Sequence, residues 1–556
     1  MERFLTFCLL ILIAAGPGQA QLTTDQRLAD FRNLADVYAK KYAFYEWKRD
    51  AIKFDALNLQ PWLARVRSVQ NDLDFYDLMA EYVASLNDAH DGYYLPSTFR
   101  ATLGFTADLY DGKVLVDSVD RDRLAAADFP FEAGDEVVSV DGKSADALMD
   151  SFLKYSVAAN TRSTRREAAR LLSRRSQFYM PHAHEIGDTA AVAIKRQSGE
   201  TATYNLPWKK DGTPVTALPG SPVVRTAPSQ DRLARGTYPR LLPQVRNWML
   251  PVLPSVLNIG ARLPVFEMPA DTFQRRLQTT DPIFSGILTV QALKIGYIRI
   301  PSFQLSFRQT DLIKREIAFY KDNSDGLILD LMRNPGGSPC QAEELLSYIM
   351  PNPFRVITQE LRVNWTDVLD YMDELDYGRQ FGYSDDEIAQ LDMTLAAIQK
   401  AISEQRPRTE PLPICGSTLQ RDPATDRTGA NIAYTKPVML LTDEFSASAA
   451  EVFAAAFQDN GRGKIFVWRT MGAGGGVTDF DAGVYTEGSV SVTISAGNRK
   501  APVKTSDFPE SPYIENIGVR PDIELDYMTK DNLLNKGKAF VEAFGNAVVE
   551  HVKASK

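Results

Sequence analysis

The sequence predicts an α/β core that follows a helical region and a smaller β-rich region. From residue 290 onward, the strand-like runs IGYIRI, GLILDL and PVMLL alternate with helix-like runs such as TDLIKREIAFYK. Strands that alternate with helices indicate a largely parallel or mixed sheet. Residues 22–100 place apolar side chains at helical spacing, whereas residues 102–208 contain short β-rich runs.

The length and charge of the chain limit the classes of protein to consider. At 556 residues the chain is long enough for two or three domains. Its net charge of −9 argues against nucleic acid or an anionic membrane surface as the main partner.

The amino-terminal residues 1–20 have the pattern of a cleavable secretory signal. Arg3 precedes an apolar run, and small residues follow up to Ala20, after which we expect cleavage. The apolar run is too short to cross a bilayer, so we expect a secreted or periplasmic protein without a stable membrane anchor; a retained anchor is the alternative. Cleavage would remove Cys8 and leave Cys340 and Cys415, either as one disulfide or as two free thiols.

The remaining chain divides into four predicted segments. Residues 21–100 form the helical region, and residues 101–208 form the β-rich region, with a hairpin turn near Ser198 and Gly199. Residues 209–285 contain eleven prolines together with many apolar side chains, Trp248 among them. This composition predicts a linker or an inhibitory segment that covers the active site, with a permanent packing arm as the alternative. Residues 286–550 form the α/β core, with a helical insertion at about 360–432.

Three short stretches contain residue types suited to catalysis. Ser448 lies between a strand and a helix, where helix N–H groups can stabilise an oxyanion; an ordinary N-cap, paired with Glu451, is the alternative. Gly336 and Gly337 follow a buried strand and expose backbone amides, although a simple turn explains them equally well. His90 ends a helical pattern, where a histidine is either a base or a favourable C-terminal charge.

These stretches together resemble one family of enzymes. SASAAE, DLMRNPGG and GDEVVSVDGKSA are similar to motifs of the tail-specific and carboxyl-terminal processing proteases, the S41 serine peptidases. The resemblance implies a crotonase-like (ClpP/crotonase) catalytic core and an inserted PDZ-like β domain at 101–208. It also implies that TLGF is the carboxylate-binding loop of that domain, with peptide binding at Leu103, Gly104 and Phe105.

The chain departs from the common pattern of this family at one position. Most members place a catalytic lysine 25 residues after the nucleophile, where this sequence has Ala473. A Ser–Lys dyad is therefore excluded, and the chain resembles a lysine-less subgroup that uses serine, histidine and glutamate. Tricorn-type enzymes and the chlamydial protease-like activity factor belong to that subgroup.

The resemblance assigns Ser448 as the nucleophile, His90 as the base and Glu515 as the carboxylate that orients the base. The oxyanion hole is then formed by Ala449 with Gly336 or Gly337. The competing residues are Lys464 and Lys504 as bases and Glu510 as the orienting carboxylate. HAHE at 182–185 is the only stretch that suggests zinc, and we expect no metal and no cofactor there.

The predicted function is that of a secreted serine endopeptidase that acts through an acyl-enzyme on proteins or peptides. The sequence does not decide whether the protein forms a homodimer. The alternative is a non-catalytic protein of the same fold that binds peptides or apolar ligands.

Overall fold

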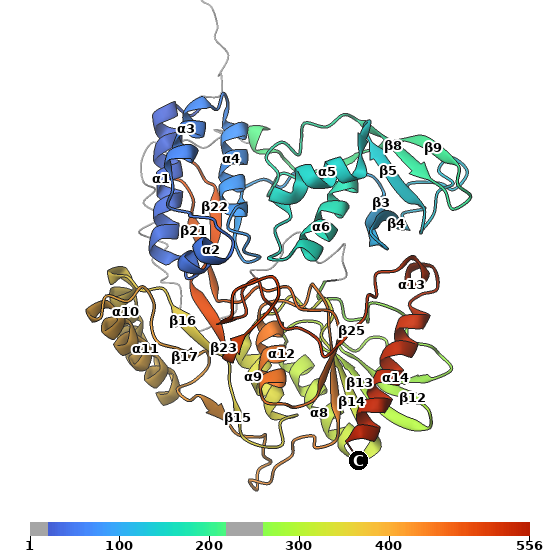
Figure 1. Cartoon of the computed structure of the whole chain (residues 1–556), viewed down its shortest axis with the longest axis vertical. Helices are drawn as coiled ribbons and strands as arrows, with labels where there is room; N and C mark the ends of the chain where they lie inside the picture. Colours follow the sequence, from blue (N-terminus) through green and yellow to red (C-terminus); the bar gives the residue numbers. More distant parts are fainter. Residues whose placement is uncertain (1–20, 218–258, 556) are drawn as a thin grey trace, which may run out of the picture.

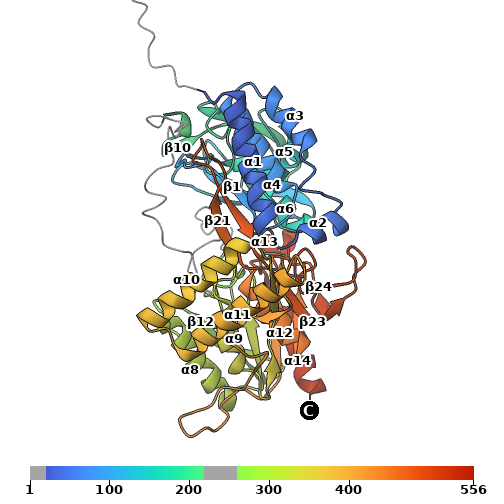
Figure 2. The same ribbon diagram turned by 90° about the vertical axis from the view of Figure 1, so that its left-hand side faces the viewer.

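The computed structural model describes residues 21–217 and 259–555. Figures 1 and 2 show two halves: the amino-terminal helices and the β domain form one, and the α/β core forms the other. The predicted signal at 1–20 and the middle of the proline-rich stretch, 218–258 with Trp248, lie outside the described residues. Among the helices that are described, none has both the length and the apolar composition needed to cross a membrane.

The amino-terminal region is helical, as predicted. Thr23 and Gln26 form a reciprocal capping box that begins the first helix, and buried aromatic side chains such as Phe31 and Tyr82 pack the helices together. The elements of this region are α1 (Thr24–Lys41), α2 (Tyr45–Ala51), α3 (Gln60–Ser68), α4 (Asp72–Ala84) and β1 (Gly92–Tyr94).

The β domain contains a sheet with the strand order β3-β4-β5-β8-β9, off which β6 pairs with β5, and a smaller sheet with the order β10-β2-β7. The predicted hairpin is confirmed: β8 and β9 are antiparallel, and Gly199 at their turn has the positive φ of 94° that favours glycine. The strands are β2 (Arg100–Thr102), β3 (Phe105–Tyr110), β4 (Lys113–Val119), β5 (Glu136–Val140), β6 (Lys143–Ser144), β7 (Arg174–Ser176), β8 (Thr189–Lys195), β9 (Thr201–Pro207) and β10 (Lys209–Asp211). The helices are α5 (Ala145–Phe152), η1 (Leu153–Tyr155), α6 (Thr161–Arg170), η2 (Leu171–Ser173) and η3 (Val215–Ala217).

The core is a mixed sheet between two layers of helices. Its strand order is β11-β12-β13-β14-β19-β20-β25, parallel from β13 to β25 and antiparallel from β11 to β13. Leu327 and Leu329 pack toward α8, α9 and α12, whereas Ile328 packs toward α14, because successive side chains of a strand alternate between faces. The strands are β11 (Phe273–Arg275), β12 (Phe284–Val290), β13 (Leu293–Arg299), β14 (Gly326–Asp330), β19 (Val438–Thr442), β20 (Lys464–Val467) and β25 (Ile523–Glu524). The helices are α8 (Phe307–Asn323), α9 (Pro339–Ser347), α12 (Ala449–Asp459), α13 (Lys530–Leu534) and α14 (Lys538–Ala554).

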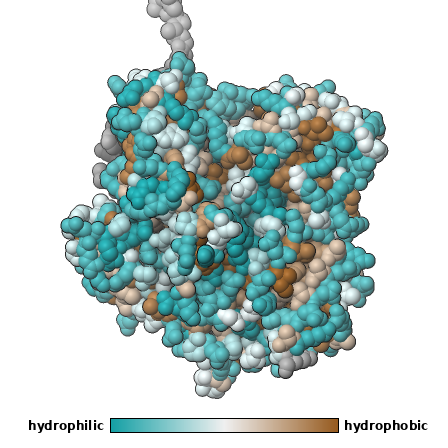
Figure 3. All heavy atoms as spheres, viewed as in Figure 1, coloured by the Kyte–Doolittle hydropathy of each residue, from teal (hydrophilic) through white to brown (hydrophobic). Residues whose placement is uncertain are grey.

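The predicted helical insertion is a helical hairpin with short strands around it. The hairpin consists of α10 (Trp365–Phe381) and α11 (Asp385–Ser403), and a glycine with positive φ, Gly382, ends the first helix. The short strands are β15 (Phe354–Arg355), β16 (Thr358–Leu361), β17 (Leu412–Pro413), β18 (Gln420–Arg421), β23 (Ser495–Val503) and β24 (Ser511–Tyr513). On the face seen in Figure 3, apolar side chains gather only in separate patches within a mostly hydrophilic surface.

One part of the core chain lies in the amino-terminal half. The hairpin of β21 (Val477–Asp481) and β22 (Ser489–Thr493) reaches up between the amino-terminal helices in Figure 1. There β22 pairs with β1, two residues after His90, and Val490 and Val492 pack into the same cluster as Phe31. This interleaving places the loop that contains His90 against the core.

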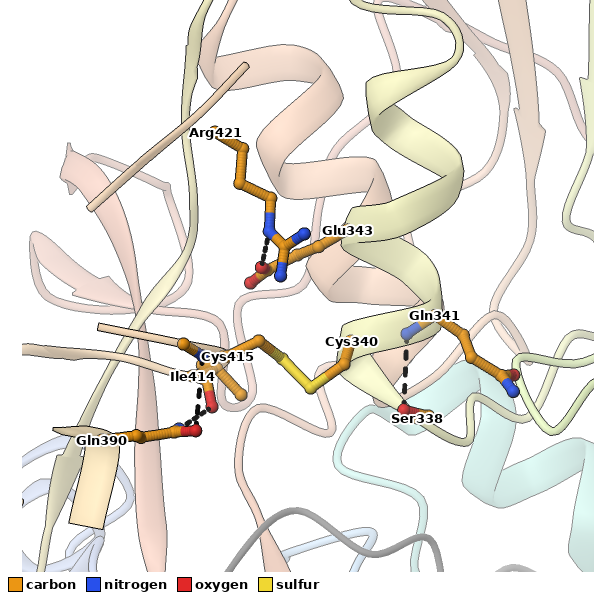
Figure 4. Close-up of a disulfide and its surroundings, with 9 residues drawn as sticks. Ser338, Cys340, Gln341, Glu343, Gln390, Ile414, Cys415 and Arg421 are labelled. Atoms are coloured by element: carbon orange, nitrogen blue, oxygen red, sulfur yellow. Dashed lines mark hydrogen bonds and ion pairs between the residues drawn. A yellow bond between two sulfur atoms is a disulfide. The ribbon is translucent and has the colours of Figure 1, made fainter. Parts of the chain in front are cut away.

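A disulfide joins Cys340 to Cys415, so the open question of their pairing is settled in favour of the bridge. Figure 4 shows that it connects the start of α9, three residues after Gly337, to the chain that follows β17. Gln390 of α11 donates to the Ile414 carbonyl beside it over 2.8 Å. The bridge therefore ties the glycine loop to the helical insertion.

Replacing both cysteines by serine should lower stability. A bridge between residues 75 positions apart restricts a long loop of the unfolded chain, which corresponds to about 2 to 4 kcal/mol. We expect a lower melting temperature for the double Cys340→Ser, Cys415→Ser variant by calorimetry, and the same shift for the reduced wild type. Equal melting temperatures for the oxidised wild type and the double variant would contradict this.

Candidate active site

Ser448 occupies a strained turn between β19 and α12. Its φ of 54° and ψ of −120° lie outside the extended region in which an ordinary N-cap residue lies. The Glu451 carboxylate accepts a hydrogen bond from the Ser448 backbone N–H over 3.2 Å, so part of the capping arrangement is present. A non-glycine residue in such a conformation costs about 1 to 3 kcal/mol and points to a functional constraint. The backbone thus separates Ser448 from a simple cap.

The residues before Ser448 are fixed by buried hydrogen bonds. One oxygen of Asp443 accepts from the backbone N–H groups of Arg333 (2.7 Å) and Phe445 (3.1 Å). The Ser446 hydroxyl donates to the Leu331 carbonyl over 2.8 Å. These bonds connect the serine turn to the loop that carries the two glycines.

The glycine loop lies directly beside the serine. A Cβ atom on Gly336 would lie 2.6 Å from Ser448 Cβ and 2.8 Å from the Ala449 nitrogen, so only glycine fits there. The Gly336 N–H itself donates to Asn334 Oδ1 over 2.8 Å. The N–H groups of Ala449 and Gly337 donate no hydrogen bond to any described residue. Both amides lie next to Ser448 and have no partner within the described part of the chain.

A second loop of glycines packs on the other side of the serine turn. Glu451 is buried and accepts hydrogen bonds from Thr470 Oγ1 (2.6 Å) and from the N–H groups of Gly472 and Ala473 (2.7 Å each). Burial raises the pKa of Glu451 to about 7, although these hydrogen bonds oppose the change. Ala473 itself is buried, so no basic side chain replaces the lysine that most of the family has there.

His90 lies in the wall of the same site. Its ring is buried, and Nδ1 has no hydrogen-bond partner among the described residues. Ala89 packs against an apolar cluster that includes Ala447, so the histidine loop borders the serine turn. Burial lowers the pKa of His90, and the charge of Asp88 opposes this, so the imidazole is neutral at physiological pH.

Glu515 is buried but is bonded to a residue other than His90. One carboxylate oxygen forms an ion pair with Lys48, and the other accepts from the Gly474 N–H over 3.1 Å. Burial raises the pKa of Glu515 to about 8; the charge of Asp88 adds to the rise and that of Lys48 opposes it. Neither Ser448 nor Glu515 forms a hydrogen bond with His90 among the described atoms.

Lys48 is the site residue that the sequence did not indicate. Its Nζ also donates to Asn516 Oδ1 (2.7 Å) and to the Asn87 carbonyl (3.0 Å), and the side chain is buried. A single lysine in the short, charged run YEWKRDA has no local feature that marks it as buried.

The competing residues lie away from the site. Glu510 and Lys504 are exposed, and Lys464 pairs with Asp522 over 3.1 Å. In HAHE, His182 contacts Asp74 (3.3 Å) and Glu185 (2.9 Å). The described residues contain no group of three or more such side chains placed to hold a metal ion.

The residues predicted to bind a peptide carboxylate in the β domain are buried. The Leu103 N–H donates to the Ser173 carbonyl over 3.0 Å, and the Gly104 carbonyl accepts from the Asp120 N–H over 2.8 Å. Phe105 is buried at the start of β3. One of the three predicted amides is therefore already engaged within the domain.

Helix α6 of the β domain docks directly on the serine turn. Arg166 forms two hydrogen bonds with Asp108 (2.9 and 2.7 Å) and donates to Glu444 (2.6 Å) and to the Tyr527 hydroxyl (2.8 Å). The Ser163 hydroxyl donates to the Glu444 carbonyl over 2.7 Å. Arg166, Asp108 and Glu444 are all buried. The β domain is therefore fixed to the residues that precede Ser448.

Replacing Arg166 by alanine should destabilise the protein by about 3 kcal/mol, because Asp108 and Glu444 are buried and each would lose one of its two arginine partners. Asp108 would keep Arg170, and Glu444 would keep Arg162. We expect a marked fall in melting temperature by calorimetry. The neighbouring Arg165→Ala is the matched control, since Arg165 makes only long contacts of 3.3 Å with exposed carboxylates. Equal effects of the two substitutions would contradict the structural role of Arg166.

Two parts of the chain match models of known protein families. Residues 294–525 match peptidase family S41, and residues 99–219 match the PDZ domain. A protein of Chlamydia pneumoniae is 25% identical over 98% of this chain and 93% of its own length. A protein of Chlamydia trachomatis is 23% identical over 92% of this chain and 90% of its own length.

Solved structures agree with the fold. Mature CPAF is 20% identical, has a TM-score of 0.73, and covers 96% of this chain and 98% of its own. Mature CPAF complexed with lactacystin gives a TM-score of 0.75 at 19% identity, covering 96% of this chain and 99% of its own. The predicted fold class, a crotonase-like α/β core with a helical amino-terminal region and an inserted PDZ domain, is confirmed.

Proposed function

We propose that this chain, a serine-type peptidase of family S41 with a PDZ domain, is a secreted endopeptidase that uses Ser448, His90 and Glu515 and forms an acyl-enzyme. The observation that carries the proposal is the strained Ser448 beside two free backbone amides, those of Ala449 and Gly337. Strain and unpaired amides are both costly in a structural turn, and both are useful at a nucleophile.

In the proposed reaction the Ser448 hydroxyl attacks the carbonyl carbon of the scissile peptide bond, and His90 takes the hydroxyl proton. The negative charge that forms on the carbonyl oxygen is stabilised by the N–H groups of Ala449 and Gly337. The carbon–nitrogen bond then breaks, and His90 returns the proton to the leaving amine. Water, activated by His90 in the same way, releases the acyl group from Ser448.

Glu515 is proposed to hold the imidazolium that forms in each step. The His90 Nδ1 atom is buried and has no partner among the described residues. Glu515 is a buried carboxylate that accepts a hydrogen bond from Gly474, in the second glycine loop beside the serine turn. To accept from His90, the carboxylate has to turn one oxygen away from Lys48 or Gly474, or the imidazole has to turn toward it. A hydrogen bond that tightens only when substrate is bound is common in enzymes of this type.

The site also favours an enzyme over a non-catalytic binding protein, because a binding protein has no use for a strained serine. Secretion is supported by the disulfide, since such bridges persist mainly in oxidising compartments. Protein or peptide substrates follow from the peptidase and PDZ domains.

Ser448→Ala and His90→Ala should each remove peptidase activity without unfolding the protein, because they delete the nucleophile and its base. Glu515→Gln should retain more activity, since that residue orients and does not react. We would measure hydrolysis of a quenched fluorescent protein substrate, labelling by a fluorophosphonate probe, and circular dichroism.

Lys464→Ala and Lys504→Ala are the matched controls, because both lysines lie away from the site. Loss of activity in either control, with activity kept in His90→Ala, would refute the assignment of the base. Labelling that persists in Ser448→Ala would refute the assignment of the nucleophile.

The pH dependence should report Glu515. Catalysis needs neutral His90 and is fastest with ionised Glu515, and burial lowers the pKa of His90 while it raises that of Glu515 to about 8. We therefore expect kcat/KM of the wild type to rise with pH through about 8. The Glu515→Gln variant should lose this rise and keep only the rise that reports His90, at a pH below the ordinary pKa of histidine. A single limb near the ordinary pKa of histidine, unchanged in Glu515→Gln, would contradict this.

A further inference from the structure

An open cavity of about 400 Å³ lies where the amino-terminal helices, the PDZ domain and the core meet. Its active-site side is formed by His90, Pro335 and Met471. Pro335 directly precedes the glycine loop that touches Ser448. A peptide whose carbonyl carbon lies at Ser448 therefore has this cavity beside it.

Most of the cavity wall is apolar. Val83 comes from α4, Tyr155 and Leu171 come from the PDZ domain, and Phe445 comes from the serine turn. Phe178 completes the wall and stacks on Tyr94, with ring centroids 4.8 Å apart. Walls of this kind fit the methylene chain of a long side chain.

One carboxylate in the wall has no hydrogen-bond or ion-pair partner among the described residues. Glu167, on α6, is 9% exposed, and it forms no hydrogen bond and no ion pair with any described residue. Burial raises its pKa; the charges of Arg170 and Arg174 oppose this from outside ion-pair distance, and Arg170 is bonded to Asp108. A carboxylate in a cavity wall that lacks a protein partner can accept a hydrogen bond from the donor of a ligand.

The charge of the cavity favours a cation. Asp91, Glu167 and Asp479 line it, and burial raises the pKa of Asp91 well above its usual range. The one lysine among the described lining residues, Lys154, is already paired with Asp77. The neutral imidazole of His90 adds no positive charge. An apolar channel with carboxyl groups in its wall matches a side chain that has an aliphatic stem and a basic end.

We propose that this cavity is a specificity pocket for a lysine or arginine side chain of the substrate, with Glu167 as the residue that accepts its basic group. The inference rests on the proposed peptidase function and extends it by naming the substrate class. The substrate is a protein or peptide with a basic residue next to the bond that is cut.

Cleavage of positional-scanning peptide libraries tests the pocket. At one position beside the cleaved bond, the wild type should prefer lysine or arginine over norleucine and glutamine by about tenfold in kcat/KM, as expected when a charged hydrogen bond is gained. Glu167→Gln, checked for folding by circular dichroism, should reduce that preference to about twofold or less. The control Glu200→Gln changes an exposed glutamate of the same domain and should keep the wild-type preference.

Binding of benzamidine, a small cation with an apolar ring, separates this inference from the catalytic one. The Ser448→Ala protein should bind benzamidine by calorimetry, and adding Glu167→Gln should weaken binding about tenfold. The proposed pocket is refuted if the wild type is active but prefers a basic residue at no position, or if Glu167→Gln does not change benzamidine binding. Either result leaves the proposed peptidase function standing. Wild type that cleaves nothing, yet binds benzamidine through Glu167, refutes the proposed function alone.

Discussion

The conformation of Ser448 depends on buried carboxylates that flank it in the sequence. Asp443 and Glu444 precede it and Glu451 follows it, and all three are completely shielded from solvent. Glu451 accepts four hydrogen bonds, one of them from Ser448 itself. These bonds fix the turn from the helix side and hold Ser448 in its strained conformation.

The same charges attach the PDZ domain to the serine turn. Glu444 is paired with Arg166 of α6, and Arg166 also holds Asp108 on the edge strand β3. A peptide that added to this edge as an extra strand would meet α6 and its ion pairs. In this chain the domain therefore supports the serine turn and forms one wall of the cavity beside it.

The sequence predicted the local elements well because each depends on short-range patterns. The core strands are continuous apolar runs, the helices have capping residues such as Thr23 and Ser306, and the hairpin turn has a glycine. The order of strands in the sheet and the insertion of β21 and β22 among the amino-terminal helices were not predictable, because they depend on pairing between distant segments.

The residues of the candidate site were predicted from the resemblance to the S41 peptidases, whereas their contacts are seen only in the structure. The sequence alone could not separate Ser448 from an N-cap, and its backbone angles now do so. It also left Gly336 and Gly337 equivalent, whereas Asn334 occupies the amide of the first and leaves that of the second free.

The ion pair between Lys48 and Glu515 shows why the sequence could not predict all contacts of the site. The two residues are 467 positions apart, and each is a charged side chain that ordinarily stays in water. Removing such a pair from water costs several kcal/mol per ion, so each residue depends on the other once both are buried. Burial and the charge of Asp88 raise the pKa of Glu515, and Lys48, on a helix near the other end of the chain, opposes that rise. The amino-terminal region therefore supplies both His90 and the lysine that pairs with Glu515.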